Sequence, residues 1–255
     1  MSLHRESSGE GPDVALLHGW GLHGGVFASL ASALASHHRV HVVDLPGHGH
    51  SAWSKSTHDL EGLSRVVAAH LPERCAVVGW SLGGLVAQRL ALLFPERVSH
   101  LVLIATGAVG AKRRDYPHAA DPTLLTGLGE RLRKDWRATV LEFLNLEVRG
   151  DANPLEALRV LRQQVDSHGA ANPAALAAYL DILRTTDLRA SATAIRAPTL
   201  VIAGEHDRLT PPEGAKTLAG LIPGAQLLMV PRAAHAPFLS HRVLVEERIT
   251  EFLAR

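Results

Sequence analysis

A serine, an aspartate and a histidine each follow a short apolar run in this sequence, and together they could carry out acyl transfer. Ser81 is the centre of Gly79-Trp80-Ser81-Leu82-Gly83, which follows Ala76-Val77-Val78 and precedes a stretch with helical spacing. Gly-x-Ser-x-Gly between a strand and a helix is typical of a sharp turn that lifts the serine hydroxyl above a sheet. The pattern predicts that Ser81 is a nucleophile; the alternative is a glycine-rich turn whose serine only caps the helix.

A serine hydroxyl needs a base that removes its proton, and that base needs an acid that orients it. Asp207 and His235 each follow a later apolar run. Because the carboxyl ends of parallel strands meet at one edge of a sheet, we expect both residues to converge on Ser81. Ser81 would attack a carbonyl carbon, His235 would move the proton, and Asp207 would hold the imidazole. Glu205 is a second candidate for the acid, ranked lower because it lies nearer the strand.

The oxyanion formed during acyl transfer needs two main-chain N–H donors. We expect one from Leu82, which follows the nucleophile, and one from Trp20 in His18-Gly19-Trp20-Gly21, because the glycines allow a close approach. The alternative for this second segment is a glycine-rich surface turn. Another loop, residues 44–51, contains no arrangement of nucleophile and base, and we interpret it as a structural turn.

Alternating strands and helices must position these groups. Near-continuous apolar runs, typical of strands buried on both faces, occupy residues 14–17, 40–43, 76–78, 101–104, 199–203 and 226–230. Helical spacing or helix caps occupy residues 26–37, 57–71, 82–94, 213–221 and 241–254. The alternation predicts an α/β fold in which helices flank a mostly parallel sheet.

The alternation stops between about residue 110 and residue 190. This segment is rich in leucine and arginine, shows no convincing strand, and has helix starts at Asn153-Pro154 and Asn172-Pro173. We therefore expect a helical cap, residues 110–189, inserted into a core formed by residues 1–109 and 190–255.

Bulk properties exclude several classes of function. The 255 residues carry a net charge of only +1, so no global field favours nucleic acid or a membrane surface. The single cysteine, Cys75, cannot form a disulfide within the chain. Neither a signal peptide nor a membrane span is visible, so we expect a cytoplasmic protein. We also expect a monomer with no metal and no cofactor, because neither an amphipathic seam nor ligand spacing is evident.

Together these motifs resemble the α/β-hydrolase superfamily over essentially the whole chain. More specifically, four segments resemble the esterases of biotin synthesis that act on pimeloyl-acyl-carrier-protein methyl ester: Leu17–Leu22, Val43–Gly47, Gly79–Ala87 and Ala233–Phe238. The resemblance implies a serine esterase that releases methanol and leaves a free carboxylate. It also implies that Trp20, Trp80, Leu82 and Phe143 border the substrate. For Phe143 the alternative is a helix-core residue.

The same resemblance implies an acidic carrier protein as partner, docked through arginines of the cap. Arg149, Arg159 and Arg162 stand in the corresponding region. Ala138, Glu142 and Leu155 stand where the family has arginine, which weakens this assignment. The alternative is that these arginines only form a solvated helix face.

Two other functions remain open at this point. One is a general carboxylesterase or lactonase for small soluble esters, with the same three catalytic residues and no protein partner. The other is a non-hydrolytic relative, either a lyase or an inactive binding protein. The intact Ser81, Asp207 and His235 disfavour an inactive protein.

Overall fold

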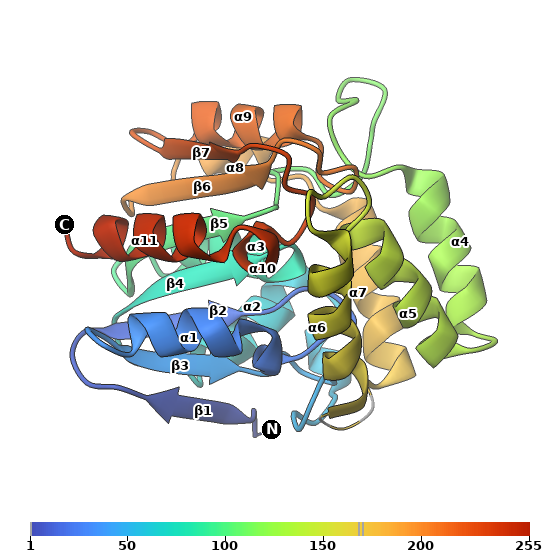
Figure 1. Ribbon diagram of the computed structural model, residues 1–255, viewed down its shortest axis with the longest axis horizontal. Helices are drawn as coiled ribbons and strands as arrows, with labels where there is room; N and C mark the ends of the chain where they lie inside the picture. The colour runs from blue at the N-terminus through green and yellow to red at the C-terminus, as the bar shows by residue number, and fades with distance from the viewer. Residues whose placement is uncertain (1, 168, 170) are drawn as a thin grey trace.

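A seven-stranded sheet forms the centre of the computed structural model, which describes residues 2–167, 169 and 171–255 (Figure 1). The strands are β1 (Arg5–Ser8), β2 (Asp13–Leu17), β3 (Arg39–Val43), β4 (Cys75–Trp80), β5 (Val98–Ile104), β6 (Thr199–Gly204) and β7 (Gln226–Val230). Their order is β1-β3-β2-β4-β5-β6-β7, and every pair is parallel except β1 with β3. The prediction of a mostly parallel sheet is confirmed.

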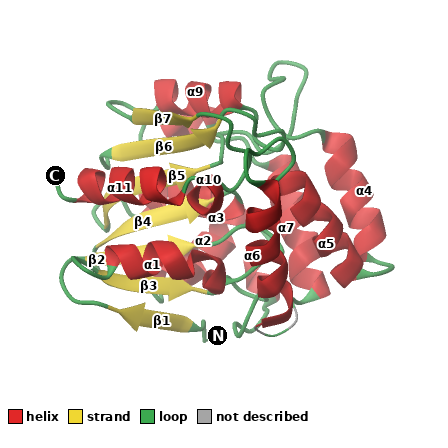
Figure 2. Cartoon of the chain, viewed as in Figure 1, coloured by secondary structure: helices red, strands yellow, loops and turns green. Residues whose placement is uncertain are grey.

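Helices cover both faces of this sheet (Figure 2). In front lie η1 (Gly24–Phe27), α1 (Ala28–Leu34), α10 (Pro237–Ser240) and α11 (Arg242–Leu253), with α1 packed against α11. Behind lie η2 (Lys55–Thr57), α2 (Leu60–Ala68), α3 (Leu82–Leu93) and α9 (Pro212–Leu221). The short helix α8 (Arg189–Ala192) packs against both α3 and α9. Because both faces are covered, all residues of β4 and β6 are buried, which explains why these strands are apolar without alternation.

Four helices stand beyond the carboxyl ends of the parallel strands, between β5 and β6 in the chain (Figure 1). They are α4 (Pro122–Leu132), α5 (Trp136–Glu147), α6 (Pro154–Ser167) and α7 (Pro173–Thr185). The predicted starts at Pro154 and Pro173 are confirmed, and the Asn172 side chain caps α7 by accepting from the Ala174 N–H at 2.9 Å. Between residues 110 and 189, the part that the structure describes contains isolated bridges but no strand.

Candidate active site

Ser81 lies at the sharp turn between β4 and α3. Its backbone is in an unusual conformation, with φ of 53° and ψ of −114°. The chain approaches itself closely here: a Cβ on Gly83 would lie 2.1 Å from the Leu17 carbonyl oxygen, and one on Gly79 would lie 2.3 Å from the Gly83 oxygen. Glycine is therefore required at both positions. Strain of this kind costs about 1–3 kcal/mol and is typical of functional turns.

The carboxyl ends of β4, β6 and β7 bring Ser81, Asp207 and His235 into one hydrogen-bonded chain. Nε2 of His235 lies 2.9 Å from Oγ of Ser81, and Nδ1 lies 2.8 Å from Oδ2 of Asp207. The second oxygen of Asp207 accepts from the main-chain N–H groups of Leu209 and Thr210, each at 2.9 Å. The carboxylate can only accept, so Nδ1 carries the proton and Nε2 accepts from the serine hydroxyl.

Burial and charge act in opposite directions on His235, whose side chain is 2% exposed. Burial disfavours the imidazolium and by itself lowers the pKa of His235. The charge and hydrogen bond of Asp207 outweigh burial and raise the pKa of His235 above its ordinary value, and Glu147 acts in the same direction when it is ionised. The site therefore makes His235 a stronger base than a free imidazole.

Glu205, the other candidate for the acid, does not hydrogen-bond His235. Its side chain is 52% exposed, and its carboxylate accepts from the main-chain N–H of Arg232 at 2.9 Å. This bond supports the turn after β7, where Arg232 has a φ of 56°. Of the two acids, only Asp207 is in contact with the imidazole.

The segment that contains Trp20 lies against the serine. A Cβ on Gly19 would lie 3.4 Å from Cβ of Ser81. Within the described residues, no acceptor takes the main-chain N–H of Trp20 or that of Leu82. Both N–H groups thus lack an acceptor in that part of the chain, as the expected oxyanion donors require.

Buried polar contacts hold this segment from behind. The indole Nε1 of Trp20 donates to the carbonyl of Leu176 in α7 at 2.9 Å. The Gly21 N–H donates to Nε2 of His48 at 3.3 Å, and the His48 ring stacks on Tyr179 with centroids 5.5 Å apart. Burial, aided by the nearby His18 charge, lowers the pKa of His48 to about 3, so this ring is neutral at neutral pH. The loop 44–51 therefore supports the Trp20 segment, a contact that the sequence motif does not reveal.

A small cavity of about 40 Å³ opens at Ser81 and His235. Phe143 of α5 lines it together with mostly apolar residues, Thr106 and Thr210. Trp20 packs edge-on against Phe143, with ring centroids 5.1 Å apart. Trp80 is fully buried and donates from Nε1 to the His235 carbonyl at 2.8 Å. Of the four residues expected to border the substrate, Phe143 lines the cavity, whereas Trp20, Trp80 and Leu82 are buried and do not line it.

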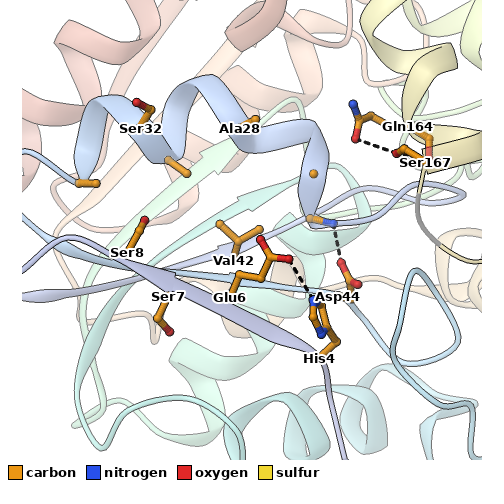
Figure 3. Close-up of a pocket in the computed structure, with 14 residues that line it drawn as sticks. His4, Glu6, Ser7, Ser8, Ala28, Ser32, Val42, Asp44, Gln164 and Ser167 are labelled. Carbon is orange, nitrogen blue, oxygen red and sulfur yellow. Dashed lines mark hydrogen bonds and ion pairs between the residues drawn. The ribbon is translucent and has the colours of Figure 1, made fainter.

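A larger hollow of about 660 Å³ lies away from the serine, between β1, α1 and the end of α6 (Figure 3). Asp44 lies at its edge, but the Asp44 carboxylate already accepts from the N–H groups of Gly24 at 2.8 Å and His50 at 3.0 Å. The remaining lining is mostly small or hydroxyl side chains, and neither Ser81 nor His235 is among them. The reactive groups therefore mark the smaller cavity as the candidate site.

The three arginines proposed for docking are all exposed. Arg149 follows α5, and Arg159 and Arg162 lie on α6. Arg162 donates to Oδ1 of Asn145 at 3.0 Å, and Arg159 donates to Oε1 of Gln163 at 3.4 Å. The hydrogen-bond partners described for Arg159 and Arg162 are thus neutral side chains.

Two acids near His235 lie outside every motif. The carbonyl of Glu147, the last residue of α5, accepts from the His235 N–H at 3.0 Å, and its carboxyl group is buried. Asp151 accepts from the Ala234 N–H at 2.8 Å through Oδ2. The one feature of the sequence that could have pointed to Glu147 is its position as an acid next to an otherwise apolar stretch of a helix.

The described residues contain no group of three or more histidine, cysteine, aspartate or glutamate side chains that could hold a metal ion. Among the helices of that part, none has the length and hydropathy needed to cross a membrane.

Comparison with known proteins supports the resemblance seen in the motifs. The family model of the α/β hydrolase fold matches residues 12–242. A protein of Nitrosomonas europaea named pimeloyl-[acyl-carrier protein] methyl ester esterase is 41% identical over 239 residues, 94% of each chain. A protein of the same name from Stenotrophomonas maltophilia is 40% identical over 252 residues, 99% of this chain and 96% of the relative.

Solved structures show the same fold. An esterase from Exiguobacterium antarcticum superposes with a TM-score of 0.89 at 24% identity, and an enol-lactonase from Burkholderia xenovorans LB400 with 0.88 at 25%. Each comparison covers 99% of this chain and 96% of the other. The chain therefore belongs to the α/β hydrolase family and, within it, to the family of the pimeloyl-[acyl-carrier protein] methyl ester esterases.

Proposed function

We propose that this protein is a serine carboxylesterase that hydrolyses the methyl ester of pimeloyl-acyl-carrier protein, a reaction of biotin synthesis. The products are methanol and the free carboxylate on the carrier. The observation that carries the proposal is the hydrogen-bonded chain from Ser81 through His235 to Asp207. It occurs in a chain about 40% identical to esterases of that name over nearly its full length.

The first half of the reaction forms an acyl-enzyme. Oγ of Ser81 attacks the ester carbonyl carbon while Nε2 of His235 takes the hydroxyl proton. The main-chain N–H groups of Trp20 and Leu82 donate to the oxyanion of the tetrahedral intermediate. As that intermediate collapses, the imidazolium returns its proton to the methoxy oxygen and methanol leaves.

The second half releases the product. His235 takes a proton from a water molecule, which attacks the acyl carbon, and then returns a proton to Oγ of Ser81. Asp207 keeps the proton on Nδ1 and stabilises the imidazolium in both halves. Phe143, supported by Trp20, gives the reacting carbonyl an apolar wall, while Trp80 and Leu82 complete the support of the site.

We assign carrier docking to the exposed Arg149, Arg159 and Arg162, whose charges suit an acidic partner. Double charge reversal, Arg159→Glu with Arg162→Glu, should lower kcat/KM for the carrier-linked ester about tenfold or more at low salt, since steering depends on charge. Hydrolysis of p-nitrophenyl butyrate by the same variant should not change. If turnover of the carrier-linked ester is equally unaffected, docking through this face is wrong.

The direct test measures methanol release from pimeloyl-acyl-carrier-protein methyl ester by the wild type and by Ser81→Ala. We expect Ser81→Ala to lose at least about 10³-fold in rate, as expected for removal of a nucleophile. An Ser81→Ala protein that keeps full activity would refute the proposal.

A second candidate is an esterase or lactonase for small soluble esters, and the small cavity at Ser81 favours it. The two candidates differ in kcat/KM for free methyl esters against the carrier-linked ester. A strong preference for the free esters would select the second candidate.

A further inference from the structure

The carboxyl group of Glu147 is buried beside the catalytic histidine and has no evident structural task. The residue is 1% exposed, and neither carboxyl oxygen has a hydrogen-bond partner within the described residues. Buried carboxyl groups are normally paired, and those that are not deserve an explanation. Glu147 belongs to α5 rather than to any motif of the active site.

The backbone fixes Glu147 against the loop that carries His235. The His235 N–H donates to the Glu147 carbonyl at 3.0 Å. Two bonds extend the contact: Ala234 N–H to Oδ2 of Asp151 at 2.8 Å, and Ala152 N–H to the Arg232 carbonyl at 2.9 Å. Glu147 therefore cannot move away from His235 without breaking a buried loop contact.

Two charged groups act on the Glu147 carboxyl, and both belong to the catalytic chain. His235, on the loop after β7, favours its ionised form, while Asp207, after β6, disfavours it. The other charged groups around this segment are at the surface or engaged: Asp151 accepts two N–H bonds, and Arg149, Glu205, His206, Arg208 and Arg232 are exposed. The carboxyl thus interacts chiefly with the Asp207–His235 pair.

Resting on the function proposed above, we infer that Glu147 is a positioning residue that tunes His235: its buried carboxyl is neutral in the resting enzyme and, once ionised, stabilises the imidazolium formed during catalysis. Burial, reinforced by Asp207, raises the pKa of Glu147 to about 8 despite the opposing effect of His235. The neutral acid consequently dominates at neutral pH. When Glu147 loses its proton at a pH above its pKa, its carboxylate places a second negative charge, beside that of Asp207, near the imidazole.

Ionisation of Glu147 should make the activity increase with pH. At low pH, activity rises as His235 loses its proton, and the uncharged Glu147 contributes nothing to that step. Near pH 8 a second rise should follow, because the Glu147 carboxylate then stabilises the developing imidazolium. Glu147→Gln keeps the shape of the neutral acid and cannot ionise, so its profile should have the first rise only.

The test measures kcat for p-nitrophenyl butyrate from pH 5.5 to 10, at the isosbestic wavelength of nitrophenol and nitrophenolate, for the wild type, Glu147→Gln and Glu142→Gln. Glu142 is the matched control, since it is an exposed acid on the same helix that pairs with Arg131 at 3.0 Å. Below pH 7 the three profiles should superimpose. Above pH 9 the Glu147→Gln value should be about threefold to tenfold lower, corresponding to a change of half to one unit in the pKa of His235.

A purely structural role would lower the whole Glu147→Gln profile without changing its shape, and that result would overturn the inference. Profiles that superimpose at all pH values would do the same. If Glu147→Gln does not fold, the side-chain carboxyl carbon of Glu147 can be followed by NMR in the wild type. Its resonance should show a titration step near pH 8, and a carboxyl group already ionised at pH 6 would overturn the inference. Ser81→Ala separates the two proposals, because its full activity would refute the esterase function whatever the Glu147 profile shows.

Discussion

Replacing Asp207 by asparagine tests the proposed catalytic acid, the one member of the catalytic chain for which the sequence offers a second candidate, Glu205. Oδ2 of Asp207 lies 2.8 Å from Nδ1 of His235, and Oδ1 accepts from the N–H groups of Leu209 and Thr210. An asparagine of nearly the same shape can keep the latter two bonds through its amide oxygen. Its NH₂ group then faces Nδ1, and because two donors cannot bond, the imidazole proton must move to Nε2. In that tautomer His235 can no longer accept the Ser81 proton.

The size of the effect follows from burial. The Asp207 side chain is 0% exposed, so solvent does not screen its interaction with the imidazolium. Losing a buried charged partner costs about 3–5 kcal/mol, which corresponds to a rate loss of about 10²-fold to 10⁴-fold. Because the imidazolium forms only during the reaction, we expect the loss in kcat rather than in KM.

The assay is steady-state hydrolysis of p-nitrophenyl butyrate, with thermal unfolding as a check on folding. Glu205→Gln is the matched control: it neutralises the neighbouring acid, which is exposed and bonds Arg232 instead of His235. We expect this control to keep activity within about threefold, as for a surface substitution. If Asp207→Asn kept more than about a tenth of the activity, or if Glu205→Gln lost as much as Asp207→Asn, the reasoning from the geometry would be refuted.

Two further predictions concern the elements that support the site. His48 is buried and neutral with a pKa of about 3, whereas in the unfolded chain it takes up a proton below about pH 6.5; the folded state therefore loses stability as pH falls. Urea denaturation at pH 7 and at pH 5 measures this loss of stability. Between these two pH values the free energy of unfolding should fall by about 2 kcal/mol less for His48→Gln than for the wild type. An equal fall in both proteins would contradict the neutral state of His48. Gly83→Ala would place Cβ 2.1 Å from the Leu17 carbonyl oxygen, so it should lower the free energy of unfolding by about 3 kcal/mol or more and impair activity. Gly220→Ala is its control, because nothing lies within 4 Å of the new Cβ. The gain in helix propensity should stabilise α9 by up to about 1 kcal/mol. Equal behaviour of the two variants would show that the turn at Ser81 does not need glycine at position 83.

The strands of the parallel sheet could be predicted because burial on both faces requires near-continuous apolar residues. β1 shows where that signal fails. Its residues, Arg5–Ser8, are polar and exposed, and the strand is defined only by antiparallel pairing with β3 at the sheet edge. α10 could not be predicted from the sequence pattern either, because it is a helix of only four residues that directly follows the turn at His235. Edge pairing and short connections are set by tertiary packing, so a local pattern contains little information about them.

The same distinction applies to the site. Ser81 and the Trp20 segment are recognisable because a strained turn and a close backbone approach require glycines at fixed spacing. His48 and Glu147 have no such local requirement. Their roles arise from contacts with Gly21 and with the His235 loop, made by segments far away in the chain. Neither contact follows from spacing, so neither residue could be assigned before the packing was known.

The helices above the sheet hold the reacting groups as well as covering them. The Leu176 carbonyl of α7 accepts the indole N–H bond of Trp20, which fixes the segment to which we assign one oxyanion donor. The Glu147 carbonyl at the end of α5 accepts the main-chain N–H bond of His235, which fixes the loop that carries the proposed base. A movement of either helix would therefore break a buried hydrogen bond to a segment that carries a proposed catalytic group, at a cost of about 1–3 kcal/mol for each polar atom left unpaired. Neither α4 nor α6 contributes a main-chain bond to the Trp20 segment or to His235 within the described residues. α6 is held to the core by another contact, because Nε2 of His23 lies 2.7 Å from the Gln164 carbonyl oxygen, so displacing α6 would also break a bond to the core.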